Sequence, residues 1–109
     1  MTVGIAADGL LGSIEKSIRI GRPVAQAVVD AHAENGRYPE TLAEIDSEFL
    51  EAIPESATVR LVHLPDPKLT VKIREDLTVG YDFIEKRWFS ARNQRRWLNE
   101  PPVLPSTPK

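Results

Sequence analysis

The chain of 109 residues contains no cysteine. Disulfide bonds, thiolate nucleophiles and cysteine-based metal sites are therefore excluded, although this absence does not indicate a cellular compartment. The sequence also has no run of 18 or more apolar residues, so the chain as given has no segment predicted to span a membrane. Its first residues lack a basic flank followed by an apolar block, and no signal peptide is predicted.

Patterns typical of catalytic sites are also missing. His32 and His63 are the only histidines, and their spacing does not suit a zinc site. No serine lies in a nucleophile-elbow pattern, and there is no glycine-rich phosphate loop. Four acidic residues of the second half do not form the Asp-x-Asp-x-Asp run of a calcium site: Asp66, Asp76, Asp82 and Glu85. We therefore expect no enzyme activity, no cofactor and no bound metal.

Charge is distributed unevenly along a chain of one-domain size. The net charge is −2, so bulk charge does not indicate a nucleic-acid-binding protein. Residues 30–55 contain eight acidic residues and one basic residue, whereas residues 86–96 contain five basic residues and no acid. The simplest interpretation is two solvated faces of opposite sign. A sharper one is that complementary patches meet between subunits.

A long amphipathic helix is predicted from about residue 10 to residue 35, after a frayed start. Asn35-Gly36 is a typical C-terminal stop, and Pro39 prevents the helix from resuming. Pro23 leaves two interpretations, a continuous kinked helix or a second helix that begins there, and the unbroken apolar spacing favours the first. Apolar or small residues recur in steps of three or four, which places them on one face: Leu10, Ile14, Ile18, Gly21, Ala25, Val28 and His32.

The rest of the chain predicts a short helix and an antiparallel meander. Thr41 and Glu44 form a capping box for a helix over residues 42–50. Residues 57–90 then alternate between apolar and polar side chains, which predicts short strands joined by tight turns. We expect the long helix to cross the inner face of this sheet. The expected core consists of Leu69, Val71, Ile73, Val79, Tyr81 and Phe83 against Ala25, Val28, Val29 and His32.

These elements predict an α+β fold in which one long N-terminal helix packs across a three- to four-stranded antiparallel sheet. The domain is expected to cover residues 1–92, with the helix at about 10–35, a linking segment at 36–56 and the meander at 57–90. Residues 93–109 are rich in proline. They are expected to form a mobile extension that begins with one or two helical turns.

The stretch DGLLGSIEKSIRIGRPVAQAVVDAHAENGRYPETLAEIDSEFLEAIP resembles the globular part of type IV pilins and of the pseudopilins of type II secretion. In that family a helix ends in a pattern such as Glu34-Asn35-Gly36-Arg37-Tyr38-Pro39, and a short segment leads into an antiparallel sheet. The similarity covers roughly residues 8–90. The family's membrane half-helix is missing from this chain, as is the cysteine pair of many major pilins. The second departure favours a minor pilin or a pseudopilin.

The resemblance implies a structural subunit of a bacterial type IV pilus or type II secretion pseudopilus. Its partners would be other pilin or pseudopilin subunits. Its location would be the periplasm or cell surface, with inner-membrane attachment through a segment missing from this chain. An exposed apolar stripe is an interaction surface, so we expect the subunit interface on the free half of the helix, at Leu10, Leu11, Ile14 and Ile18. Ile14→Asp or Ile18→Asp should then block assembly without unfolding the domain, whereas Val28→Asp should unfold it.

A second interpretation concerns basic residues interleaved with aromatic ones near the C-terminus. Arginine and lysine neutralise phosphates, and aromatic side chains stack on bases. The chain would then be a soluble binding module that holds DNA or an acidic protein on the face formed by Lys86, Arg87, Trp88, Arg92, Arg95, Arg96 and Trp97. A solvated strand with a subunit contact explains the same residues, so DNA is the less favoured partner. A third alternative is a small adaptor domain that dimerises through the free half-helix.

Overall fold

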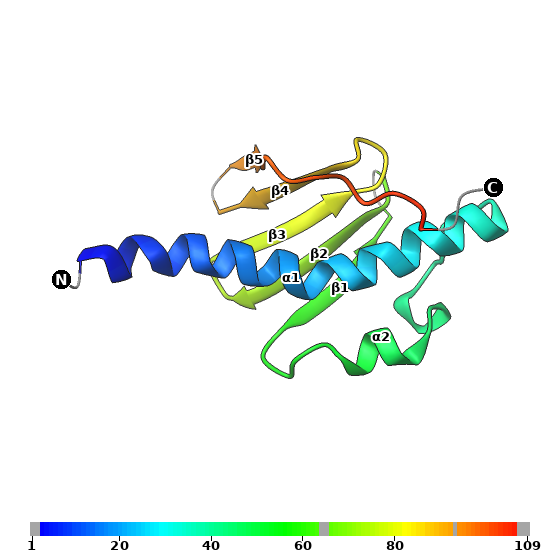
Figure 1. Ribbon diagram of the computed structural model, residues 1–109, viewed down its shortest axis with the longest axis horizontal. Coiled ribbons are helices and arrows are strands. Elements are labelled where there is room, and N and C mark those ends of the chain that lie inside the picture. Colours follow the sequence, from blue (N-terminus) through cyan, green and yellow to red (C-terminus); the bar gives the residue numbers. More distant parts are fainter. Residues whose placement is uncertain (1–2, 64–65, 93, 107–109) are drawn as a thin grey trace.

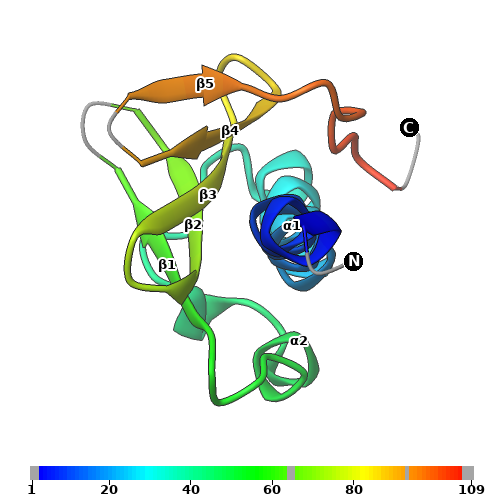
Figure 2. The ribbon, with the colours of Figure 1, turned by 90° about the vertical axis from the view of Figure 1, so that its left-hand side faces the viewer.

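The computed structural model describes residues 3–63, 66–92 and 94–106 (Figure 1). Helix α1 lies across one face of an antiparallel sheet with the strand order β1-β2-β3-β4-β5 (Figures 1 and 2). The α+β class and the helix-on-sheet plan are confirmed, but the sheet has five strands instead of three or four. The elements are α1 (Val3–Asn35), the 3-10 turn η1 (Leu42–Glu44), α2 (Ser47–Glu51), β1 (Thr58–Val62), β2 (Lys68–Arg74), β3 (Leu77–Asp82), β4 (Arg87–Ala91) and β5 (Arg95–Trp97).

Helix α1 is a single element with Pro23 inside it, so the favoured interpretation of a continuous helix is confirmed. It begins at Val3, several residues before the predicted start. Figure 1 shows a bend in the middle of α1, in the part of the helix that contains Pro23. At the C-terminus the N–H of Gly36 donates to the carbonyl of His32 at 2.9 Å, and Gly36 has a φ of 77°. Glycine adopts this left-handed conformation at little cost, and the predicted stop is confirmed.

The core lies between α1 and strands β2 to β4. The expected residues Ala25, Val28, Leu69, Val71, Val79, Tyr81 and Phe83 are all buried. Ile73 is only half-buried, because the pairing between β2 and β3 shifts between Val71 and Arg74 and turns the end of the strand. Trp88 is a fully buried core residue that was not expected there.

The predicted helix over residues 42–50 is divided into η1 and α2. Ile45 has an extended backbone conformation between them, and its side chain is buried. Part of the predicted capping arrangement is present, since the Glu44 carboxylate accepts hydrogen bonds from the N–H groups of Glu40 and Thr41. Burying Ile45 therefore interrupts a segment whose local sequence favours a helix.

The β3–β4 turn has a lysine at the left-handed position where glycine or asparagine is usual, and an aspartate at its start. The Asp82 carboxylate accepts the N–H groups of Ile84 and Glu85, both at 2.9 Å. The N–H of Lys86 donates to the Asp82 carbonyl at 2.7 Å, and Lys86 has a φ of 60°. The aspartate side chain thus satisfies the turn's backbone donors and holds a hairpin that otherwise lacks typical turn residues.

The segment after β4 forms a strand, so the expectation of helical turns there was wrong. Ala91 pairs with Arg95 and Phe89 with Trp97, which makes β5 the edge of the sheet. The N–H of Leu98 continues this pairing by donating to the Trp88 carbonyl at 2.8 Å. The boundary predicted at residue 92 therefore falls inside a hairpin.

Residues 98–106, the C-terminal strap, run along α1 and pack on the domain (Figure 1), which corrects the prediction of a separate extension. Val103 is buried, and its N–H donates to the Tyr81 hydroxyl at 2.9 Å. Burial raises the pKa of Tyr81, so this hydroxyl stays protonated and donates to the Val103 carbonyl at 3.4 Å. Ser106 donates its N–H and its hydroxyl to the Asp30 carboxylate at 2.8 and 2.7 Å. The prolines of this segment do not prevent packing. Because proline has no backbone N–H, the segment has few donors that need hydrogen-bond partners.

Candidate interaction groove and basic face

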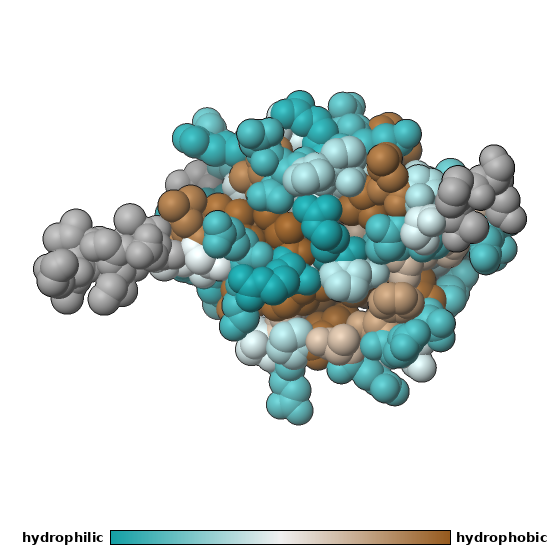
Figure 3. Space-filling model, viewed as in Figure 1, coloured by the Kyte–Doolittle hydropathy of each residue, from teal (hydrophilic) through white to brown (hydrophobic). Residues whose placement is uncertain are grey.

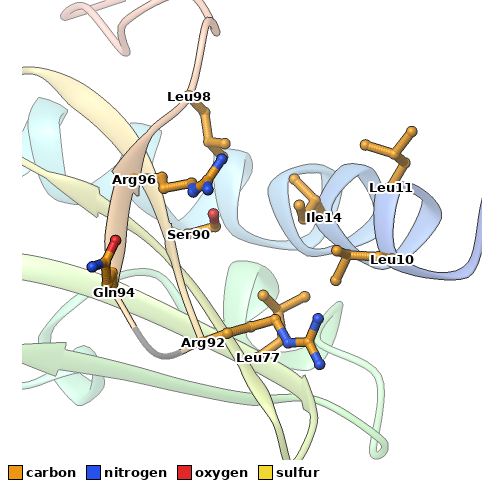
Figure 4. Close-up of a pocket in the computed structure, with 9 residues that line it drawn as sticks. All are labelled: Leu10, Leu11, Ile14, Leu77, Ser90, Arg92, Gln94, Arg96 and Leu98. Atoms are coloured by element: carbon orange, nitrogen blue, oxygen red, sulfur yellow. The ribbon is translucent and has the colours of Figure 1, made fainter. Parts of the chain in front are cut away.

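A groove of about 680 Å³ runs between the N-terminal half of α1 and the β4–β5 hairpin (Figure 4). Leucine and isoleucine side chains form its helix wall, and polar side chains come from the hairpin. The lining residues of this N-terminal groove are Leu10, Leu11, Ile14, Leu77, Ser90, Arg92, Gln94, Arg96 and Leu98. Figure 3 shows hydrophobic residues at the surface over this half of α1, between hydrophilic ones. Such a site suits a partner with both apolar and charged groups.

Three of the four helix residues predicted at a subunit interface line this groove. Leu11 is the most open, since the residue is 60% exposed. Leu10 and Ile14 are half-buried and pack against the core. Placing Ile18 in a free stripe was wrong, because Ile18 lies where α1 already crosses the sheet and is only 6% exposed. Ile18→Asp should therefore unfold the domain, contrary to the first expectation.

The seven residues predicted to form one basic face divide among different parts of the fold. Successive residues of a strand point to opposite sides of a sheet. Trp88 points toward α1 and is completely buried, so its inclusion in an exposed face was wrong. Arg96 pairs with Ser90, and both enter the N-terminal groove on the helix side. Arg92, just after β4, lines the same groove. The sheet thus brings part of the predicted basic face and part of the predicted helix interface together in the N-terminal groove.

The other basic residues lie on the opposite, outer face of the sheet, where they surround two aromatic rings. The Arg87 guanidinium lies 4.6 Å from the centre of the Trp97 ring, and that of Arg95 lies 4.8 Å from the Phe89 ring. The Phe89 and Trp97 rings meet edge to face, with 6.3 Å between their centres. Lys86 is exposed in the β3–β4 turn. This outer cluster offers guanidinium groups to a ligand, but arginines already cover the ring of Trp97.

Asp76 positions one of the groove arginines. Hydrogen bonds from the Arg74 side chain, at 2.7 Å from Nε and 3.1 Å from Nη2, hold the pKa of Asp76 below its usual value. Nη2 of Arg92 lies 3.4 Å from the same carboxylate. Two guanidinium groups share one carboxylate at this end of the groove, so positive charge remains in excess.

The acidic stretch lies at the other end of the molecule. Helix α2 sits below the C-terminal half of α1 in Figure 1, far along the helix from the groove. Glu48 and Glu51 of α2 are exposed, as are Ala52 and Glu55 after it. Arg37, the one basic residue of the stretch, lies 3.8 Å from Glu44. The two charged surfaces predicted from the sequence are therefore separate in the fold, with α2 carrying the acidic one.

The acidic residues considered for calcium make other contacts. Asp82 lies 3.9 Å from Lys68, and both side chains are buried. His63 is bonded through Nε2 to the Glu40 carbonyl at 3.0 Å. Within the part of the chain that the structure describes, no group of three or more His, Cys, Asp or Glu side chains is placed to hold a metal ion. None of the helices in that part is long and apolar enough to cross a membrane.

Comparisons with known proteins found no matching family model, curated protein or solved structure. The similarity to pilins and pseudopilins therefore stays a prediction.

Four groove residues were not predicted as site residues: Leu77, Ser90, Gln94 and Leu98. The signal for one of them, Leu98, was present in the sequence. If residues 95–98 are interpreted as a strand, alternation places Arg96 and Leu98 on one face of the sheet and Arg95 and Trp97 on the other. The helical interpretation of this segment concealed that alternation.

Proposed function

We propose that this chain is a structural subunit of a pilin-like polymer, either a minor pilin or a pseudopilin of type II secretion, which assembles through the N-terminal half of α1. The observation that most supports the proposal is the exposure of Leu11 beside an apolar groove, on a helix that extends past the sheet (Figure 1). Covering apolar surface with a second subunit contributes about 25 cal/mol per Å². An exposed leucine next to a groove is therefore a favourable place for contact.

The arrangement of helix and sheet supports the same proposal. The sheet buries one side of α1 over its middle, and the C-terminal strap packs beside its C-terminal half. Among the α1 side chains that the structure describes, those of residues 9–35, the most exposed large apolar one is Leu11 in the N-terminal half. In the proposed setting the protein works in the periplasm or at the cell surface. Inner-membrane attachment before assembly would come from a segment that is not part of this chain.

Leu11→Asp in the natural protein, expressed in its own cells, tests the proposal. The matched control is Arg19→Asp, since Arg19 is also exposed on α1 but does not line the N-terminal groove. We expect Leu11→Asp to reduce the protein in sheared-surface and cross-linked polymer fractions at least tenfold, and Arg19→Asp to leave it near the wild-type level. Circular dichroism of both purified variants checks that they are folded. Wild-type protein that never enters a polymer, or Leu11→Asp that assembles normally, would refute the proposal.

A second candidate function is binding of an anionic polymer on the outer face of the sheet. The observation in its favour is the cluster of Arg87 and Arg95 around Trp97 and Phe89. Because guanidinium groups already lie over Trp97, we expect contacts to phosphates and not stacking on bases. Binding to duplex DNA would weaken with salt, with a log–log slope of about −0.9 for each phosphate contacted. Arg87→Ala and Arg95→Ala should each reduce that slope by about 1. A flat salt dependence would exclude this function.

A further inference from the structure

We infer that the N-terminal groove receives helix α2 of a second copy of this chain, so that copies join head to tail. The inference rests on the proposed function, because it names the contact by which one subunit would meet the next. It follows from two surfaces of opposite charge that lie at different ends of the molecule, one a groove and the other a projecting helical turn.

The groove supplies positive charge beside apolar surface. Arg92 and Arg96 extend from the hairpin toward α1 (Figure 4), and both are exposed. Asp76 lies outside the groove lining and already contacts Arg74 and Arg92. Its single carboxylate therefore does not neutralise Arg74, Arg92 and Arg96. Among the residues that the structure describes, none that lines the groove is acidic. An occupant must therefore bring negative charge and an apolar contact for Leu11.

Helix α2 presents those groups. Glu48 and Glu51 are three residues apart, which places them on the same side of the helix, and both are exposed. Ala52 follows them and is also exposed. Phe49 and Leu50 pack against the core, so the helix is held with its carboxylates outward. Figure 2 shows α2 at the margin of the molecule, to one side of α1. One turn of this size suits a groove of ligand-sized volume.

The positions of the two surfaces decide the type of assembly. The groove lies beside the N-terminal half of α1 and α2 lies by its C-terminal half (Figure 1), so the two do not meet within one chain. Groove against groove, or α2 against α2, would place like charges together, which suppresses symmetric dimers built on either of those two contacts. A single groove–α2 contact between two copies leaves one groove and one α2 free on the pair. Such a heterologous contact continues into a ring or an open filament.

A charge exchange tests the inference. The groove variant carries Arg92→Glu and Arg96→Glu, and the helix variant carries Glu48→Arg and Glu51→Arg. All four positions are exposed, so both variants should fold. Sedimentation equilibrium of the wild-type chain at low salt should show association that weakens as salt rises. Each variant alone should associate at least tenfold more weakly than the wild type. An equimolar mixture should recover association, because every groove then meets an α2 of opposite charge.

Several results would overturn the inference. One is a wild-type chain that stays monomeric at every concentration and salt. Another is loss of association in the groove variant but not in the helix variant, which would indicate a different acidic occupant. Failure of the mixture to recover is a third. These outcomes are separate from the fate of the proposed function, which depends on polymer fractions from cells. Normal polymers containing either charge variant would remove this contact but leave the subunit proposal intact.

Introduced cysteines give an independent measurement, because the chain has none of its own. Gln94 lines the groove and is exposed. Chains with Gln94→Cys mixed with chains carrying Glu51→Cys should form disulfide-linked heterodimers under mild oxidation. Lys72→Cys is the control partner, since Lys72 is an exposed residue of β2 that does not line the groove. If Glu51→Cys cross-links equally well to Gln94→Cys and to the control Lys72→Cys, the result would count against docking in the groove.

Discussion

A single methyl group added at Gly21 should push α1 away from the sheet. A Cβ atom at this position would lie 2.8 Å from Cγ2 of Val71, closer than real side chains approach, and 3.6 Å from the Trp88 ring. Val71 and Trp88 are completely buried, so neither moves aside freely. Gly12, on the same helix, has nothing within 4 Å of such a Cβ and is exposed. The two glycines therefore form a matched pair that differs in packing.

The expected magnitudes follow from that difference. Replacing glycine by alanine inside a helix stabilises it by about 1 kcal/mol. Gly12→Ala should therefore raise the free energy of unfolding by up to this amount. Overpacking a close-packed core by a methyl group costs about 1–3 kcal/mol. Gly21→Ala should combine both effects, for a net change between about zero and a loss of about 2 kcal/mol.

Thermal and urea unfolding of the two variants measure this prediction. Each kcal/mol shifts the melting temperature of a domain of this size by about 4–8 °C, so Gly12→Ala should melt at least about 4 °C above Gly21→Ala. Adding Val71→Ala to Gly21→Ala removes the colliding methyl and should cost less than Val71→Ala alone, as a double-mutant cycle would show. Equal stabilisation by both alanines would mean that α1 does not approach the sheet at Gly21.

Three further predictions follow from burial and hydrogen bonding. Val28→Asp places an unpaired charge at a position with no exposed surface, and loss of the native circular dichroism spectrum should report unfolding. Tyr81→Phe leaves the buried N–H of Val103 without its acceptor and should lower the free energy of unfolding by about 1–3 kcal/mol in urea titrations. Burial opposes ionisation of Asp30, but hydrogen bonds from Ser106 and Gln26 still lower its pKa. The lowered pKa stabilises the fold above the unfolded-state pKa of about 3.9, and this contribution disappears as pH falls through the folded-state value. The melting temperature of Asp30→Asn should therefore fall less than that of the wild type on acidification; equal falls would contradict the assignment.

Much of the helix was readable from local pattern. The apolar repeat predicted which side of α1 faces the sheet, and Gly36 with Pro39 predicted its end. Alternation in β2 and β3 predicted the core residues of the sheet. These features depend on side-chain spacing and on the conformational preferences of glycine and proline, which are properties of a few neighbouring residues.

The candidate site was only partly readable. Leu10, Leu11 and Ile14 were found as an apolar surface, and the arginines were found as a basic run. Their meeting at one groove depends on β5, a strand of only three residues, whose alternation is too short to distinguish it from the helical turns that were predicted there. Ile18 and Trp88 were misplaced because each is buried by a segment that is distant in the sequence, and the neighbouring residues do not indicate such burial.

The sequence by itself determined the helix, its stop, the meander and the separation of acidic from basic stretches, because each is encoded by residues close together in the chain. Only the tertiary structure decided which arginines enter the groove and which lie on the outer face, because that depends on the pairing of β5 with β4. It also decided that the C-terminal strap packs against Tyr81 and Asp30. The hydrogen bonds that hold the strap there join residues separated by 22 positions in the sequence for Tyr81 and by 76 positions for Asp30. Contacts over such distances arise only when the hydrophobic core has brought α1 and the sheet together.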